Sequence, residues 1–119
     1  GCYQPMGMES GYIPNERITA SSTFAPTLSA WNGRLNTQNG VSGSEGSWTA
    51  LTNDQNQWLQ VDLGQMSTIS GVITQGRNGY TGQGGGQWVT SFKLQLSNDG
   101  QTFTTVVDAT TLQEKVIHL

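Results

Sequence analysis

The chain has 119 residues, of which 34% are hydrophobic, 11% are charged and 16 are glycine. A chain of this length buries roughly two thirds of its unfolded surface, so we expect one domain, residues 1–119, with a hydrophobic core. The net charge of -3 and the five dispersed Lys and Arg residues argue against a nucleic-acid ligand and against a strongly basic membrane-binding face.

The N-terminal end of the sequence carries the single cysteine, Cys2. Cys2 has no partner for an internal disulfide, and it lies too near the terminus to indicate catalysis. It either pairs outside this chain or has lost its partner. The chain starts at Gly1 without a signal-peptide pattern, and its apolar runs are too short to span a bilayer. We therefore interpret it as a piece of a longer precursor.

Short strands are predicted along the chain, because Gly, Pro and β-branched residues interrupt every helical pattern. Residues 17–21 and 34–36 are short strand or bridge candidates. Residues 58–63 alternate in polarity, which predicts a strand whose Leu59, Val61 and Leu63 face the core. This pattern predicts an all-β fold.

Further strands are expected in the second half of the chain. Residues 69–75 read as one strand, and residues 91–97 as another with Phe92, Leu94 and Leu96 facing inward. The Asn98-Asp99-Gly100 sequence then favours a tight turn, and residues 102–107 are predicted to pair back as the other arm of a hairpin.

Three segments between the strands are too long and too rich in glycine to be simple turns. They are loop 1 (residues 22–33), loop 2 (38–53) and loop 3 (76–87). Long loops on a rigid sheet are the usual place for binding residues.

Several motifs, in order and at compatible spacing, resemble the discoidin family, also called the coagulation factor V/VIII type C domain family. The resemblance covers the chain up to about Asp108. It rests on Cys2, Met6-Gly7-Met8-Glu9-Ser10-Gly11, Ile18-Thr19-Ala20-Ser21-Ser22, Arg34-Leu35-Asn36, Gln57-Trp58-Leu59-Gln60-Val61-Asp62-Leu63-Gly64, Ile73-Thr74-Gln75-Gly76, Val89-Thr90-Ser91-Phe92-Lys93 and Ser97-Asn98-Asp99-Gly100.

The resemblance implies a jellyroll-like β-sandwich of the galactose-binding-like type, with long loops that face the ligand as spikes. Relatives act in adhesion, coagulation, glycan binding and growth-factor capture. In the family the hairpin that ends near Val107 is followed by further strands and by a closing cysteine that pairs with the one near the start. Here the chain ends at Glu114-Lys115-Val116-Ile117-His118-Leu119, and we expect both to be missing. We therefore expect a domain that is incomplete at its C-terminal end, or one completed by another chain or a second copy.

Loops 1 and 2 and the segment after them offer a few candidate ligand contacts. Phe24 and Leu28 are the apolar candidates of loop 1, because membrane-binding relatives carry such side chains there. Trp31 and Trp48 are expected to pack against the sandwich. In loop 2, Glu45 is interpreted as a solvated charge. Further along, Asp54 and Asn56 either hydrogen-bond sugar hydroxyls or simply form a turn.

Loop 3 combines an arginine, amides and a tyrosine on a glycine-rich scaffold, a set that stacks on a sugar ring and donates to its oxygens. The candidate ligand-binding residues there are Arg77, Asn78, Tyr80 and Gln83. An alternative is that this tip contacts no ligand.

An enzyme is not expected, because His118 and Cys2 are the only His and Cys and no base is placed beside a nucleophile. No cofactor or metal site is indicated, although a structural calcium ion stays open. We predict a non-catalytic, extracellular recognition module that binds cell-surface glycans. The alternatives are an anionic phospholipid membrane and a protein or peptide partner. We expect Asp62 to satisfy backbone groups.

Overall fold

A computed structural model of the chain describes residues 4–77, 86–107 and 116–118. The chain divides into two compact units, unit 1 (Gly1–Gln87) and unit 2 (Trp88–Leu119). In the described parts the regular elements are strands and 3-10 helices of three or four residues. The predicted all-β class is therefore confirmed. No helix in these parts is long and apolar enough to cross a membrane.

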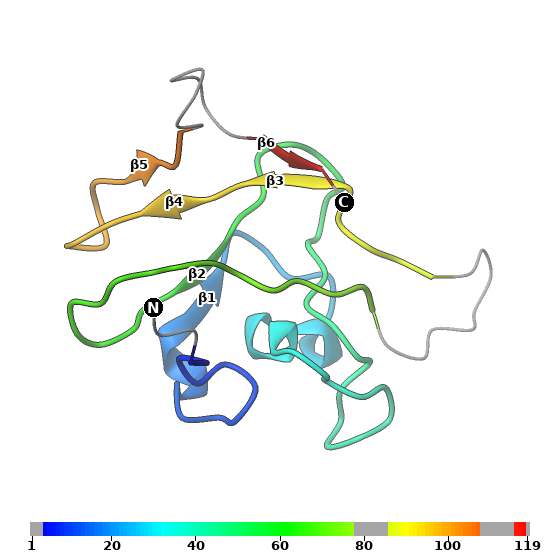
Figure 1. Ribbon diagram of the computed structural model, residues 1–119. Coiled ribbons are helices and arrows are strands. Elements are labelled where there is room, and N and C mark those ends of the chain that lie inside the picture. Colours follow the sequence, from blue (N-terminus) through cyan, green and yellow to red (C-terminus); the bar gives the residue numbers. More distant parts are fainter. Residues whose placement is uncertain (1–3, 78–85, 108–115, 119) are drawn as a thin grey trace. The chain divides into compact units, whose positions relative to one another are not determined.

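Unit 1 is built around the antiparallel pair β1 (Ile18–Ala20) and β2 (Leu59–Val61), seen in blue and green in Figure 1. The register places Ile18 opposite Val61. One backbone hydrogen bond beyond each end of the pair extends the contact, from Ser21 N–H to the Trp58 carbonyl (3.0 Å) and from Asp62 N–H to the Arg17 carbonyl (2.8 Å). This pair confirms the predicted strand around residues 17–21.

Three 3-10 helices accompany this strand pair, namely η1 (Asn15–Arg17), η2 (Pro26–Leu28) and η3 (Ala30–Gly33). The first leads directly into β1, and the other two lie within loop 1. Pro26 opens η2, where its fixed φ suits the first turn of a helix.

The core of unit 1 is small. Ile13, Ile18 and Ala30 are buried together, and the partly buried side chains that pack on them are Met8, Ala20, Trp48, Val61 and Leu63. Gly7 (φ +115°) turns the chain so that its carbonyl accepts the Ile13 N–H at 3.1 Å. A residue with a side chain rarely adopts this φ, so Gly7 delivers Ile13 to the core.

The strand predicted for residues 58–63 is found there as β2, but the predicted burial of Leu59 is wrong. Val61 and Leu63 pack on the core as expected, whereas the side chain of Leu59 is exposed. The described sheet here has only two strands, so it buries few of the side chains that alternate along β2. The Asp62 carboxylate accepts the Gly64 N–H at 2.8 Å, which confirms its expected backbone role.

The strand predicted for residues 69–75 is not formed, and Ile73 is 81% exposed. Residues 34–36 form no strand either, because Asn36 takes a left-handed φ of +61° that strand residues do not adopt. Asn36 is joined to Gln75 by side-chain hydrogen bonds: its N–H donates to Gln75 Oε1, and Gln75 Nε2 donates to its Oδ1 at 3.1 Å. Side chains, not a backbone ladder, therefore connect these two segments.

Unit 2 contains two antiparallel pairs in its described part (Figure 1). Strand β3 (Ser91–Lys93) pairs with β6 (Val116–His118), and β4 (Gln95–Leu96) pairs with β5 (Thr104–Thr105). The hairpin predicted around Asn98-Asp99-Gly100 is confirmed.

The single strand predicted for residues 91–97 is divided at Leu94, because β3 and β4 have different partners. Phe92 and Leu94 are partly buried, but Leu96 is exposed, so the prediction that Leu96 faces inward is wrong.

Candidate ligand-binding loops

Loops 1 and 2 are hydrogen-bonded to each other along their length. The Phe24 N–H donates to the Thr49 carbonyl at 2.8 Å, and the Thr49 N–H donates to the Leu28 carbonyl at 3.1 Å. The Glu45 N–H donates to the Thr27 carbonyl at 3.0 Å. These backbone contacts make the two loops one connected surface rather than two independent ones.

Ser22 joins three neighbouring segments at the start of loop 1. Its carbonyl accepts the indole N–H of Trp48 at 2.9 Å, and its hydroxyl oxygen accepts the Leu51 N–H at 3.0 Å. The same hydroxyl donates to Gln57 Oε1 at 2.6 Å. Trp48 is partly buried against the core, so this tryptophan packs in the unit as the sequence predicts.

The two apolar candidates of loop 1 differ in accessibility. Phe24 is 61% exposed, whereas Leu28 is only 4% exposed. A buried side chain offers a ligand no surface, so Leu28 is better described as a structural residue. The prediction for Trp31 was wrong in the opposite direction. Its side chain was expected to pack against the sandwich, but it is exposed. Leu51 of loop 2, which sequence reasoning missed, is also 61% exposed.

Asp54 and Asn56 are exposed and belong to one tight turn. Asp54 Oδ1 accepts the Asn56 N–H at 2.8 Å and the side-chain amide of Gln57 at 3.0 Å. These hydrogen bonds, chiefly that from the Asn56 N–H, hold the pKa of Asp54 below its usual value of 3.8. The carboxylate is therefore charged at neutral pH.

The same turn keeps polar groups available to a ligand. Among the described residues, none hydrogen-bonds Asp54 Oδ2, the Asn56 side chain or the indole N–H of Trp58. Trp58 is 50% exposed, although its backbone is held to Ser21. Sequence reasoning placed Trp58 only in a strand motif and missed this exposed aromatic side chain.

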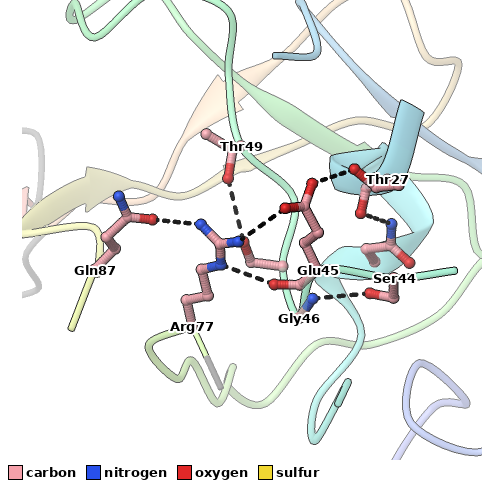
Figure 2. Close-up of polar contacts among 9 residues, drawn as sticks. Thr27, Ser44, Glu45, Gly46, Thr49, Arg77 and Gln87 are labelled. Carbon is pink, nitrogen blue, oxygen red and sulfur yellow. Dashed lines mark hydrogen bonds and ion pairs between the residues drawn. The ribbon is translucent and has the colours of Figure 1, made fainter. Parts of the chain in front are cut away.

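Arg77 and Glu45 form an ion pair that sequence reasoning did not predict (Figure 2). Arg77 Nη2 lies 3.8 Å from Glu45 Oε1, and Arg77 Nε donates to the Glu45 carbonyl at 2.8 Å. Glu45 Oε2 accepts the Thr27 hydroxyl, and Arg77 Nη1 donates to Gln87 Oε1 at 2.8 Å. The Glu45 side chain is 47% exposed, so it is partly solvated as predicted, but it also contacts residues of loops 1 and 3, which the sequence did not predict.

Arg77 is a predicted ligand contact whose side chain is only 8% exposed. The available signal for the pairing was the presence of opposite charges on two long loops of a chain that has only five cations. The two residues are separated by 32 positions, and no local pattern brings them together. The other predicted residues of loop 3 (Asn78, Tyr80 and Gln83) and Cys2 lie outside the described residues.

In the described part of the chain, no group of three or more His, Cys, Asp or Glu side chains comes together in a way that would hold a metal ion. The exposed groups gathered in the same unit are a carboxylate, amides, hydroxyls and aromatic rings. Such groups can bind a ligand through hydrogen bonds and stacking.

Comparisons with a family model and with known proteins point to the same domain family. The family model described as "F5/8 type C domain" matches residues 17–118. EGF-like repeat and discoidin I-like domain-containing protein 3 of Homo sapiens is 41% identical over 122 residues, covering 98% of this chain and 24% of that protein. Lactadherin of Sus scrofa is 36% identical, with 98% and 28% covered.

A third relative is the venom prothrombin activator pseutarin-C non-catalytic subunit of Pseudonaja textilis. It is 37% identical over 116 residues, which cover 98% of this chain and 8% of that subunit. The chain thus spans about a quarter of the first two relatives and less than a tenth of the third.

Proposed function

Because the chain belongs to the F5/8 type C, or discoidin, domain family, we propose that it is a recognition module that binds cell-surface glycans through loops 1 and 2 and the adjoining turn at residues 54–58. The family is one of β-sandwich domains, and its members here are non-catalytic binding domains of extracellular proteins. The chain is accordingly an extracellular, non-catalytic binding domain, and the glycan is the part that we propose.

The observation that carries the proposal is the turn at residues 54–58. Within five residues it presents a carboxylate, a side-chain amide and an indole, all exposed, on a backbone fixed by hydrogen bonds to Ser21. Sugars are bound by aromatic faces that cover their C–H groups and by fixed polar groups that pair with their hydroxyls. The turn provides both kinds of group.

Charge favours a glycan over an anionic membrane. Residues 4–77 contain three arginines and no lysine. The guanidinium of Arg34 donates to the Met8 carbonyl (2.9 Å) and to Asn15 (2.7 Å), and that of Arg77 is held by Glu45 and Gln87. Binding to anionic lipid needs several cations near the surface, whereas the turn presents the negative charge of Asp54.

A membrane is the second candidate because of the exposed apolar residues. Phe24 and Leu51 are each 61% exposed. They lie on segments joined by the hydrogen bonds of Thr49 and Ser22. Apolar side chains held in this way suit insertion into the interface of a bilayer.

One pair of assays separates the two candidates. The chain is applied to an array of neutral and acidic oligosaccharides, and in parallel it is pelleted with phosphatidylserine-containing liposomes. We expect a glycan signal, and liposome binding without any glycan signal would overturn the proposal. Titration calorimetry with the strongest array hit then tests the turn.

In that titration, Asn56→Ala is expected to weaken binding by about tenfold, the equivalent of roughly 1.4 kcal/mol. The matched control is Asn98→Ala, which removes the same group from an exposed turn of unit 2 and is expected to leave affinity unchanged. Equal affinities for the two variants would exclude the turn as the site. Phe24→Ser tests the second candidate and is expected to weaken liposome binding.

A further inference from the structure

We propose that Arg77 is a positioning residue: one guanidinium sets the relative arrangement of loops 1 and 2 for binding without touching the ligand. This inference rests on the proposed function, because it takes the two loops to be part of the binding surface. It changes the role predicted for Arg77, from a ligand contact to a group that holds the loops.

The Arg77 guanidinium contacts protein groups on three sides (Figure 2). Arg77 Nε and Nη1 donate to the Glu45 carbonyl and to Gln87 Oε1, both at 2.8 Å, and Nη2 faces the Glu45 carboxylate. The side chain is only 8% exposed. A planar fork engaged on three sides and shielded from water has little left to offer a ligand.

The contacts of Arg77 extend to loop 1 through Glu45. The Glu45 carboxylate that faces Arg77 also accepts the Thr27 hydroxyl of loop 1, while the Glu45 N–H donates to the Thr27 carbonyl. Arg77 thus reaches loop 1 through a residue of loop 2. Glu45 itself is flanked by the buried residues Ser44 and Gly46, which are joined by a 2.9 Å hydrogen bond from the Gly46 N–H to Ser44 Oγ (Figure 2).

Arg77 also hydrogen-bonds Gln87 at the other end of loop 3. The Arg77 N–H donates to the Gln87 carbonyl at 2.8 Å, in addition to the side-chain bond between the same two residues. Arg77 therefore fixes the chain on both sides of residues 78–85. The group formed by Thr27, Glu45, Arg77 and Gln87, which we name the loop junction, unites residues from all three loops.

The physical consequence is preorganisation. The four residues of the loop junction are polar, and they are joined by hydrogen bonds and an ion pair. Loops that are already ordered lose less conformational entropy on binding. Losing the junction should therefore weaken binding even though every ligand contact is kept.

The test measures loop order and affinity on the same variants. Amide hydrogen exchange is followed by NMR for Arg77→Ala, Arg77→Lys and, as the matched control, Arg34→Ala, which removes a guanidinium with two hydrogen bonds elsewhere in unit 1. Both Arg77 variants are expected to raise exchange at the Glu45 and residue 77 amides by tenfold or more, with Thr19 and Gln60 of the β1–β2 pair unchanged. Arg34→Ala should leave the Glu45 amide protected.

Affinity is measured by calorimetry with the strongest oligosaccharide from the array. Arg77→Ala and Glu45→Ala are each expected to weaken binding by about tenfold, and the double variant by no more than either one. Arg77→Lys should not restore the affinity, because an ammonium group does not reproduce the planar fork of the guanidinium. Additive losses would show that Arg77 and Glu45 act independently, and full affinity in Arg77→Lys would show that the planar fork is not needed. Either result would overturn the inference.

The two proposals fail in different ways. An array without any glycan signal overturns the proposed function, and the exchange measurement still tests the loop junction. Unchanged protection of the Glu45 amide in Arg77→Ala overturns the positioning role, even if glycan binding is found.

Discussion

Unit 1 and unit 2 are each stabilised internally by a different kind of contact. In unit 1, residues far apart in the sequence meet: Ile18 lies opposite Val61, and Arg77 reaches Glu45. In unit 2, neighbouring residues form the hairpin between β4 and β5. Unit 1 contains the buried apolar residues, whereas none of residues 88–107 is buried. Unit 1 thus depends on tertiary contacts, and the described hairpin of unit 2 depends mainly on local ones.

The turn of unit 2 shows how local these contacts are. Asp99 Oδ1 accepts the N–H groups of Gln101 and Thr102, each at 2.8 Å. The Gly100 N–H donates to Ser97 Oγ at 2.8 Å, and Gly100 has a φ of +76°. Residues that form such turns can be recognised in a sequence because every partner lies within three positions.

The largest effect is expected from emptying the core of unit 1. Ile18 is 2% exposed, and Ile18→Ala should lower the free energy of unfolding by about 2–5 kcal/mol, because the lost methyl groups leave a cavity. The measurement is urea unfolding followed by tryptophan fluorescence. The control Ile73→Ala makes the same chemical change at an exposed site and should stay within about 0.5 kcal/mol.

Unit 2 supplies the comparison for this variant. Leu96 is exposed in the β4–β5 pair, so Leu96→Ala is expected to lose much less stability than Ile18→Ala. Equal losses at Leu96 and Ile18 would contradict the view that unit 1 depends on buried apolar contacts and the β4–β5 hairpin does not.

The next largest loss of stability is expected at two glycines with positive φ. Gly100→Ala meets nothing within 4 Å and should lose only the backbone energy of the left-handed conformation, about 1–2 kcal/mol. A Cβ on Gly7 would lie 2.7 Å from Tyr12 Cβ, so Gly7→Ala should lose about 1–3 kcal/mol more. Thermal unfolding checks both, and a smaller loss for Gly7→Ala would mean that its turn does not deliver Ile13 to the core.

The smallest effect concerns pH and the turn of unit 2. Hydrogen bonds from Thr102 N–H, Gln101 N–H and Ser97, largest first, hold the pKa of Asp99 below its usual value of 3.8. A depressed pKa in the folded state means that the stabilisation is complete well above pH 3.8. It is lost as the pH falls through the lower folded value.

NMR titration of the Asp99 carboxyl and of the Gln101 and Thr102 amides measures this. The amide shifts should follow the carboxyl below pH 3.8, and they should lose that response in Asp99→Asn. A carboxyl that titrates at or above 3.8 would show that the local hydrogen bonds do not stabilise the charged form.

The successes and errors of the sequence predictions follow the same division. The all-β class, β1, the β4–β5 hairpin and the backbone role of Asp62 were predicted correctly, because each rests on residues close in sequence. The strand at residues 69–75 and the inward-facing Leu59 and Leu96 were wrong, and the contacts of Glu45 were missed, because each depends on whether a distant segment covers or contacts the residue. That residues 1–119 form one incomplete domain stays a prediction, but β6 (Val116–His118) is a strand that the sequence analysis did not expect after the hairpin.

The sequence by itself determined the family and fold class, through motifs spread along the chain, and the turns, through residues whose backbone preferences are local. Only the tertiary structure decided which loop residues are available for binding. It exposed Phe24 and Trp58, buried Leu28, and placed Arg77 on Glu45 from 32 positions away. The physical reason is that burial and ion pairing depend on the partner, and the partner of a loop residue is chosen by the fold.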